Sequence, residues 1–392
     1  MSDPVVIVGM ARTPIGSMQG QFSEVSAVEL GAAAIKAAID RSGVPLDAIS
    51  SVDMGCVLSA GLRQAPARQA TIGAGLPVRV SATTINKVCG SGMKAIMNAY
   101  DGLTLGRTDV AIAGGMESMT NAPYLMSQGR GGYRFGDATI YDHMTMDGLE
   151  DAYAKSAMGL FAEKTCSKYQ FTREEQDAFA ITSLRRAQQA ITDGKFDSEI
   201  TPFVVKSRRG DTLYAQDEQP GKGNIEKIPQ LRPAFKKDGS VTAANSSSIS
   251  DGAAALVLTR LSVAKKLGLK PLAKVSDYAS NSHEPEWFTT APVGAIKKLL
   301  KALDWSKNDV DLYEINEAFA VVTMAAMKDL DLPHEKVNVH GGACALGHPI
   351  GASGARIIVT LLAAMQLYEK KKGIAAICIG GGEALAVALE LM

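Results

Sequence analysis

Two runs of this chain echo each other, and the echo constrains its fold more than any other feature. Residues 109–117 and 374–383 are both apolar, both turn into consecutive glycines, and both end on glutamate. Upstream of each run, a turn containing glycine and serine opens an apolar helical segment, residues 89–100 and 351–365. The echo predicts two similar halves, each with a buried strand that ends in glycines.

Alternating strand and helix patterns indicate the class of fold. Ser26 and Glu29 form a capping-box pattern that predicts a helix ending near Gly43, and a second helix is expected from Thr172 to about Gly194. Short apolar runs are typical of strands buried on both faces, and they occupy residues 5–8, 110–113, 337–339 and 375–379. This alternation predicts a layered α/β fold.

The chain is long enough for two or three compact units, because it has 392 residues. We expect an N-terminal α/β half over residues 1–118 and a C-terminal half over 271–392. Residues 119–249 are rich in Gly, Arg, Lys and Asp, which indicates a long irregular insertion. After it, the chain is expected to return to the first half up to about residue 270.

Composition excludes several classes of partner. The 41 acidic residues balance the 41 basic ones, so neither nucleic acid nor a membrane surface is expected as a partner. Five cysteines without regular spacing argue against a disulfide framework and favour a reducing compartment. No signal peptide and no run of about 20 apolar residues is visible. We therefore expect a cytoplasmic protein.

Cys89 is the best candidate for a nucleophile. It precedes Gly90, Ser91 and an apolar helical stretch, so its sulfur is expected at a helix N-terminus. The positive end of the helix dipole favours a thiolate, which predicts a lowered pKa for this thiol. The plain alternative for this site, considered alone, is a buried and inert cysteine.

His348 and Cys378 complete the predicted reaction centre. His348 lies in a glycine-rich turn, where its imidazole can activate the Cys89 sulfur; a structural histidine is the alternative. Cys378 ends a strand-like run in front of three glycines, so a substrate can approach its thiol with little obstruction. A small apolar residue that closes the strand would be the usual interpretation of Cys378 without the other two residues.

Asn316 is the fourth candidate. Its amide follows the strand-like residues 312–315 and can hold a water that stabilises an oxyanion, although a helix cap is an equally ordinary role. His340, Cys344 and His348 can be read as a metal cluster, but their spacing matches no zinc pattern. The sequence therefore predicts neither a metal nor a redox cofactor.

These four motifs, which follow one another along the chain in the order Cys89, Asn316, His348 and Cys378, resemble the thiolase family, which comprises acetyl-CoA C-acetyltransferases and 3-ketoacyl-CoA thiolases. The resemblance implies a duplicated α/β/α/β/α fold with an inserted loop domain that covers coenzyme A and mediates tetramer contacts. It also implies an enzyme of fatty-acid metabolism that converts two acetyl-CoA into acetoacetyl-CoA and CoA, reversibly. An acyl-cysteine on Cys89 and ping-pong kinetics are expected, with Cys378 as acid and base. The backbone N–H groups of Cys89 and Gly380 would bind the oxyanion.

The resemblance also assigns residues to the substrate tunnel. Two departures from the family pattern are visible: Ala157 replaces a histidine of the acetoacetyl-CoA type, and an arginine near the nucleotide is missing. Lys222 or Lys227 is expected in place of that arginine. The expected binding residues are Leu149, Met158, Lys222, Ala234, Phe235, Ala243, Ser247, Phe288, Ala318 and Phe319.

Other interpretations of the sequence stay open. A 3-ketoacyl-CoA thiolase with a broader range of chain lengths is the nearest alternative. A decarboxylating ketoacyl synthase shares the duplicated fold but has no equivalent of Cys378, and an inactive thiolase-like binding protein is the third. Residues 130–133 resemble the family's tetramerisation loop, so a homotetramer is expected.

Overall fold

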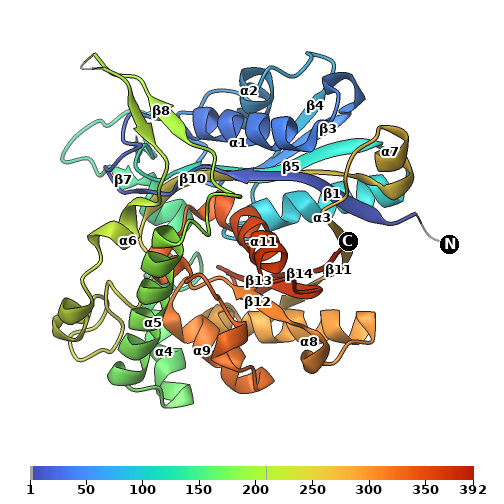
Figure 1. Ribbon diagram of the computed structural model, residues 1–392. Helices are drawn as coiled ribbons and strands as arrows, with labels where there is room; N and C mark the ends of the chain where they lie inside the picture. The colour runs from blue at the N-terminus through green and yellow to red at the C-terminus, as the bar shows by residue number, and fades with distance from the viewer. Residues whose placement is uncertain (1–2, 209) are drawn as a thin grey trace.

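Five layers make up the protein, with two sheets alternating with three layers of helices (Figure 1). The computed structural model describes residues 3–208 and 210–392. Helices α1 and α2 cover the first sheet, α8 and α9 cover the second, and α3 and α11 lie between the sheets. The helices are α1 (Ala27–Ser42), α2 (Pro66–Gly73), α3 (Ser91–Thr104), α8 (Ala291–Leu303), α9 (Ala320–Leu330), α10 (Ala343–Leu346) and α11 (Ile350–Leu367).

Each half contributes strands in the same spatial order. The first half runs β1-β10-β5-β3-β4 and the second runs β11-β14-β13-β12, with antiparallel pairs first and parallel pairs last. Only two residue pairs join β1 to β11, so the two sheets are the halves of one hydrogen-bonded ten-stranded sheet that meet at this edge. The strands are β1 (Val5–Arg12), β3 (Ser51–Gly55), β4 (Ser81–Ile85), β5 (Val110–Ser118), β10 (Ser250–Arg260), β11 (Ala273–Ser282), β12 (Leu312–Ile315), β13 (Lys372–Ile379) and β14 (Glu383–Leu391). The predicted duplicated α/β architecture is confirmed.

One predicted strand is wrong. Residues 337–339 form no strand, and only Val337 makes a single parallel bridge, to Tyr313 of β12. The reason lies in Asn338, whose backbone has φ 49° and whose side chain hydrogen-bonds both the N–H and the C=O of Ile315, at 2.8 and 2.9 Å. In the first half, β4 pairs with β3 through backbone hydrogen bonds. At the matching place in the second half, the side-chain amide of Asn338 makes the hydrogen bonds to β12 instead of a strand.

The predicted helix ends are confirmed at α1 and α5 (Arg173–Thr192). Both begin with a complete capping box, formed by Ser26 with Glu29 and by Thr172 with Glu175. Gly43 closes α1 in the left-handed conformation at φ 67°, which glycine adopts without strain. Helix boundaries were therefore readable from capping chemistry alone.

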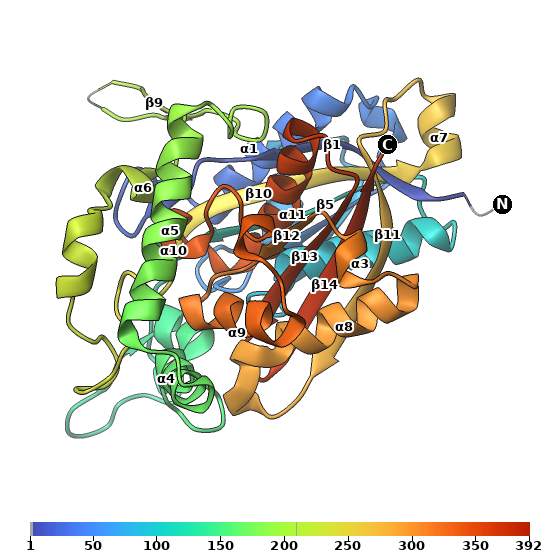
Figure 2. The same ribbon diagram turned by 60° about the horizontal axis from the view of Figure 1, so that its bottom comes forward.

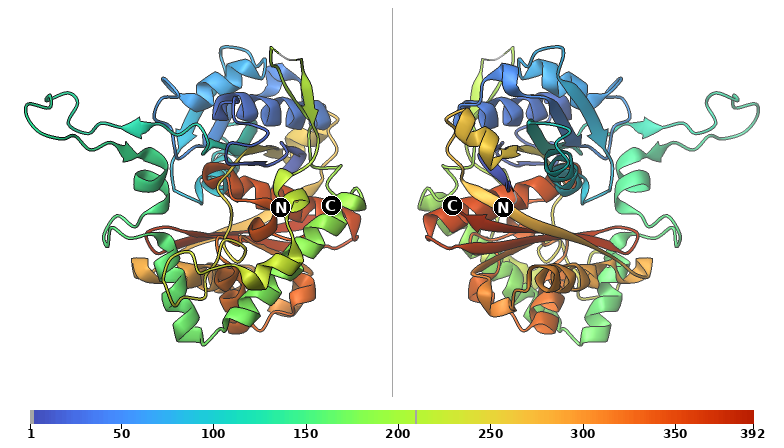
Figure 3. Two further views of the ribbon diagram at one scale, coloured as in Figure 1. Left: turned by 90° about the vertical axis from the view of Figure 1, so that its left-hand side faces the viewer. Right: turned by 90° about the vertical axis from the view of Figure 1, so that its right-hand side faces the viewer.

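The insertion is more ordered than its composition indicated. It contains α4 (Met158–Tyr169), α5 and the short α6 (Glu218–Lys222), which stand together on the side away from both termini (Figures 1 and 2). An extended loop, residues 126–140, projects from the body between β6 and β7 (Figure 3). The remaining short elements are β2 (Gly16–Ser17), β6 (Tyr124–Leu125), β7 (Tyr141–Asp142), β8 (Phe203–Val205), β9 (Thr212–Tyr214) and α7 (Leu261–Lys266). The boundaries 118, 249 and 270 stay predictions.

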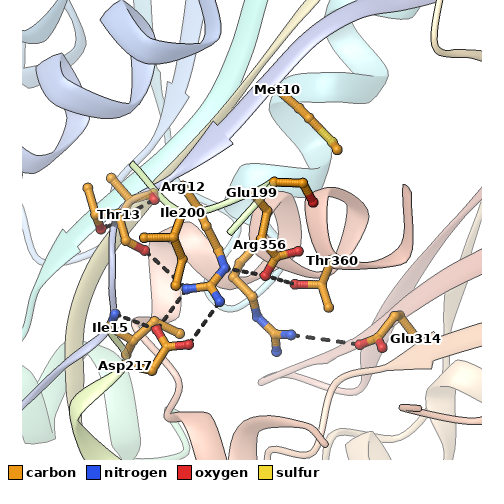
Figure 4. A network of polar contacts seen from close by, with 12 residues as sticks. Met10, Arg12, Thr13, Ile15, Glu199, Ile200, Asp217, Glu314, Arg356 and Thr360 are labelled. Carbon is orange, nitrogen blue, oxygen red and sulfur yellow. Dashed lines mark hydrogen bonds and ion pairs between the residues drawn. The ribbon is translucent and has the colours of Figure 1, made fainter. Parts of the chain in front are cut away.

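A buried ionic network fastens the insertion to both halves (Figure 4). Arg12 of β1 is completely buried; its Nε lies 2.6 Å from Glu199, and its two terminal nitrogens lie 2.7 and 2.8 Å from Asp217. Glu199 also accepts from the hydroxyl of Thr360 on α11, at 3.2 Å. Arg356, one turn earlier on α11, faces Glu314 of β12 at 3.7 Å.

Helix α11 is the most apolar element. It is the one helix of the described residues with the length and composition of a membrane span, at a mean hydropathy of 1.5, and 89% of it is buried. A helix between two sheets has no solvent face, so an apolar surface all round is what its position requires. Its hydropathy therefore reflects the core of the fold.

Candidate active site

A cavity of about 460 Å³ lies where the insertion meets the ends of the two central helices. It gathers residues that the sequence places far apart: Cys89, Leu149, Met158, Ala234, Phe235, Ala243, Ser247, Phe288, Ala318, Phe319, His348 and Gly380. Cys378 is fully buried and packs against the cavity residues Phe288, Ala318 and Phe319. Most of the predicted residues thus surround one space, whereas Asn316 does not line it and Lys222 lines a neighbouring groove. Their individual roles stay predictions.

A tight turn presents Cys89 just before α3. Gly90 caps the helix, and the Ser91 hydroxyl accepts from the Lys87 N–H at 2.8 Å and donates to the Val88 carbonyl at 2.6 Å. Val88 has φ 47°, a left-handed conformation that strains a β-branched residue. The expected position of the sulfur at a helix N-terminus is what the structure shows.

Glycines let α3 and α11 cross in backbone contact, which brings Cys89 and His348 to the same cavity. A Cβ on Gly92 would lie 2.9 Å from the Ala355 nitrogen, and one on Gly354 would lie 2.5 Å from the Met93 nitrogen. Neither space admits a side chain. The two helices therefore start side by side. Cys89 and His348, which precede the first turns of α3 and α11, line the same cavity.

His348 has a defined hydrogen-bonding state. The Ser353 hydroxyl donates to the Pro349 carbonyl at 2.9 Å, so it accepts from His348 Nδ1, which lies 2.5 Å away. The proton thus belongs on Nδ1, and Nε2 is a buried atom without a protein partner. Burial lowers the pKa of His348 to about 3, so the imidazole is neutral at physiological pH. A neutral ring with a free Nε2 can accept a proton.

The predicted lowering of the Cys89 pKa is wrong for the free protein. Burial raises the pKa of this thiol to about 11, and hydrogen bonds from the Gly380 and Cys89 backbone N–H groups oppose the shift without cancelling it. Desolvation disfavours the thiolate more than the helix terminus favours it. Cys89 is therefore a thiol before substrate arrives.

This state of Cys89 has a measurable consequence. A thiol with a pKa near 11 should be alkylated by iodoacetamide about tenfold faster for each added pH unit between 7 and 10. Rates are measured from the loss of unmodified Cys89 peptide by mass spectrometry. A plateau reached by pH 8 would contradict the prediction, and denatured protein, with an ordinary thiol, is the control.

Cys378 lies near the end of β13, and Gly380, in the loop that follows, lines the cavity. Burial, and the nearby Cys89 sulfur, raise the pKa of Cys378 above its ordinary range. The interaction between the two thiols, and the contact of the Gly380 N–H with the Cys89 sulfur, place both groups at the nucleophile. Two backbone N–H groups that converge on the sulfur fit an oxyanion pocket.

Asn316 has an amide with no protein partner. Both its side-chain oxygen and nitrogen are buried and unpaired, while its backbone N–H donates to Ala376 at 2.9 Å. A buried amide of this kind is the usual place for an ordered water. The alternative of a helix cap is wrong, because Phe319 is the N-cap of α9 and no side chain caps it.

A second groove of about 280 Å³ continues from the cavity, sharing Gln219, Ala243 and Ser248 with it. Lys222 and Lys227 both line it. The Lys222 ammonium lies 2.6 Å from Glu218, whereas Lys227 has no ion pair with any residue of 3–208 or 210–392. Ala157 lines neither space and is the uncapped N-terminus of α4.

Comparisons with known proteins decide the family. The model "Thiolase, N-terminal domain" matches residues 5–262, and "Thiolase, C-terminal domain" matches residues 269–391. The chain belongs to the thiolase family. The predicted family and fold are thereby confirmed.

Relatives of this thiolase match along their whole length. An acetyl-CoA acetyltransferase of Cupriavidus necator is 48% identical over 98% of this chain and 99% of its own, and acetyl-CoA acetyltransferase 2 of Arabidopsis thaliana is 50% identical over 99% and 97%. Acat5 thiolase from Ascaris suum, solved in complex with coenzyme A, has a TM-score of 0.94 at 45% identity, covering 99% of this chain and 100% of that one. An acetyl-CoA acetyltransferase of Bacillus anthracis has a TM-score of 0.97 at 41% identity, covering 100% and 99%.

Sequence reasoning missed parts of this thiolase site. Ser353 fixes the tautomer of His348, and Glu117 accepts backbone hydrogen bonds beneath the cavity. The signal for Glu117 was available, since it ends the first of the two echoing runs. No group of three or more possible metal ligands occurs within the parts of the chain that the structure describes.

Proposed function

We propose that this thiolase is an acetyl-CoA acetyltransferase that condenses two acetyl-CoA into acetoacetyl-CoA and CoA, and runs the reverse thiolysis. The observation that carries the proposal is the convergence of two thiols and an unpartnered imidazole nitrogen on one cavity. Relatives of about half identity that carry this name support it. The solved Ascaris relative holds coenzyme A, which supports CoA as the ligand here.

The proposed first step transfers an acetyl group to the protein. The Cys89 sulfur attacks the thioester carbon while Nε2 of His348 takes the thiol proton; the bond to the CoA sulfur breaks, and the proton passes to that leaving sulfur. The N–H groups of Cys89 and Gly380 bind the oxyanion meanwhile. A neutral Cys–His pair suits this step, because no buried charge has to be stored beforehand.

The proposed second step forms the carbon–carbon bond. Reacting as its thiolate, Cys378 takes a proton from the methyl group of a second acetyl-CoA, and the enolate attacks the acetyl carbon on Cys89. The bond to the Cys89 sulfur then breaks, and the Cys378 thiol passes the methyl proton to that leaving sulfur, which restores both cysteines. The enolate oxygen would accept from a water on the Asn316 amide, whose buried atoms await a partner, and from His348 only while Nε2 carries a proton. Ping-pong kinetics follow from the covalent intermediate.

Thiolysis of acetoacetyl-CoA by CoA tests the function, followed by the loss of the ultraviolet absorption of the 3-ketoacyl-CoA. Comparing 3-ketoacyl-CoA of about 4, 6 and 10 carbons separates the acetoacetyl enzyme from a thiolase of broader range. Inactivity with all three would refute the proposal. An acetyl adduct on Cys89 that is absent in Cys89→Ser would exclude an inactive binding protein.

Cys378→Ala distinguishes a thiolase from a decarboxylating ketoacyl synthase. We expect condensation and thiolysis to fall by about 10²- to 10⁴-fold, because removal of a positioned acid–base group costs this much. Acetylation of Cys89 by acetyl-CoA should remain, since the first step does not need the second thiol. A variant with full turnover would support the synthase.

We also propose that Lys227 contacts the phosphates of CoA more strongly than Lys222, because Glu218 already neutralises Lys222. Lys227→Ala should raise KM for CoA about three- to tenfold, and Lys222→Ala less than about twofold. The N-acetylcysteamine thioester lacks phosphate and is the control, for which both variants should match the parent. Equal effects of the two variants would contradict the assignment.

We propose that the enzyme is a homotetramer in the cytoplasm. The extended loop carries a fully exposed Phe135, and Met126 and Ile140 on it are also exposed. An apolar surface of this kind is typical of a subunit contact. Light scattering should give the mass of four chains, and Phe135→Asp should lower it; a monomeric parent would refute the assembly. Localisation is tested by cell fractionation, and roles in fatty-acid metabolism by the substrate comparison above.

A further inference from the structure

The two glutamates that end the echoing runs make contacts with opposite halves of the chain. Glu117 lies in β5 of the first half and is fully buried, whereas Glu383 begins β14 of the second half and is about one-third exposed. Their positions match in sequence and differ in the sheet, because β5 continues through Glu117 while β13 ends at Ile379. Each nevertheless reaches a segment that carries a reacting side chain of the other half.

Glu117 holds the first turn of α11. Its carboxylate accepts from the backbone N–H of Gly351 at 2.8 Å, and from those of Val57 and Leu58 at 3.0 and 3.1 Å. A Cβ on Gly351 would lie 2.6 Å from the same carboxylate, so this contact requires glycine. Burial raises the pKa of Glu117 to about 7, and the three backbone N–H groups oppose this shift. His348 precedes that helix by two residues, so its backbone is fixed from this side.

The same junction supports the wall beneath the nucleophile. Glu117 binds the N–H groups of Val57 and Leu58, and Ile350 directly precedes the bound Gly351. The side chains of these three residues belong to an apolar cluster that packs against Cys89 and Leu149. A shift of the carboxylate would therefore move both the helix of His348 and the surface under the Cys89 sulfur.

Glu383 ties the other pair of segments together. Its carboxylate lies 2.6 Å from the Lys87 ammonium and accepts from the Ser282 hydroxyl at 3.2 Å. Lys87 starts the turn that presents Cys89, and Glu383 directly follows the loop that begins with Gly380. The ion pair thus joins the nucleophile's turn to the loop whose N–H binds the oxyanion. Being partly exposed, such a pair adds only about 0–1 kcal/mol to stability.

We propose that Glu117 and Glu383 are positioning residues that each reach across to the opposite half, Glu117 holding the helix of His348 and Glu383 holding the turn of Cys89. The proposal rests on the acyl-transfer function proposed above. Neither carboxylate touches the substrate cavity, so both act through other residues. Duplication of the half would explain why each glutamate contacts the opposite half. Each half supplies part of the reaction centre and one glutamate that positions the part supplied by the other half.

The test measures kcat, KM for CoA and the single-turnover rate of Cys89 acetylation in Glu117→Gln, Glu117→Asp, Glu383→Gln and Lys87→Met. We expect kcat to fall about 10- to 100-fold in the Glu117 variants and at least about threefold in the other two, with KM within about twofold of the parent. The double variant Lys87→Met/Glu383→Gln should be no slower than the slower single variant, because both changes break one interaction.

A matched control lies on the same strand. Glu390 at the other end of β14 also pairs with a lysine, Lys274, at 2.6 Å, accepts from a serine hydroxyl, and has similar exposure. Glu390→Gln should retain the parental kcat and have the same thermal stability as Glu383→Gln.

Each result decides the proposal. It is overturned if Glu383→Gln and Lys87→Met match Glu390→Gln in kcat, or if their effects add in the double variant. The proposal would also be overturned by a third result. In it, Glu117→Gln loses kcat and CoA affinity equally, whereas Glu117→Asp keeps its kcat. Should a Glu117 variant fail to fold, the fold-safe Glu383 arm still decides. A parent without thiolysis activity would refute the function itself, whereas an active parent with indifferent variants refutes only this inference.

Discussion

Cys89→Ser should lower the rate of acetyl transfer by at least about 10⁴-fold, because losses of this size follow the removal of a covalent nucleophile. A hydroxyl is a far weaker nucleophile than a thiol, and the neutral His348, with its pKa lowered to about 3 by burial, is too weak a base to compensate. Steady-state thiolysis of acetoacetyl-CoA measures the loss, and intact-protein mass after exposure to acetyl-CoA should show no adduct.

The serine variant is informative because it preserves the cavity. Oxygen is smaller than sulfur, and the turn before α3 is held by Ser91 and by backbone contacts that the change does not touch. CoA affinity should therefore stay within about twofold of the parent, since no contact to pantetheine is lost. Cys166→Ser, at a buried thiol in α4 that lines neither the cavity nor the groove, is the matched control and should still be acetylated at Cys89. Turnover within tenfold of the parent would remove Cys89 from the mechanism.

Sequence reasoning located the residues of the site because their motifs are local. Glycines after Cys89 and on both sides of His348 mark places where backbones touch, and the space around Gly92 and Gly354 shows why glycine is needed there. Capping boxes at Ser26 and Thr172 gave helix starts for the same reason: the chemistry is contained within four residues. The duplicated fold followed from the echo of two runs.

Reasoning from local sequence failed where burial decides. The helix terminus at Cys89 predicted a lowered pKa, but desolvation depends on how the insertion and the second half cover the sulfur, which no local motif records. Residues 337–339 have strand composition, yet the Asn338 side chain takes the hydrogen bonds that a strand would form. The tautomer of His348 likewise depends on Ser353, whose hydroxyl proton is used by a carbonyl.

The buried network at Arg12 carries the largest predicted effect on stability. Arg12→Met should lower the free energy of unfolding by about 3–5 kcal/mol, because Glu199 and Asp217 would remain buried without their cation. Urea denaturation followed by circular dichroism measures the change. Lys36→Met breaks an exposed pair with Asp40 and should cost no more than about 0.5 kcal/mol. Equal midpoints for the two variants would contradict the prediction.

A triple variant separates the value of the network from the damage of breaking it. If Arg12→Met destabilises by stranding two carboxylates, then adding Glu199→Gln and Asp217→Asn should recover at least about half of the loss, since neutral amides cost less to bury. Asp217 also accepts from the backbone of Ile15 at 2.8 Å, a contact that an asparagine oxygen can keep. If the triple variant is no more stable than the single one, the pairing itself stabilises the junction of insertion and halves. Recovery of the free energy of unfolding would instead show that the charged groups add little net stability. Their role would then be to fix the position of the insertion over the cavity.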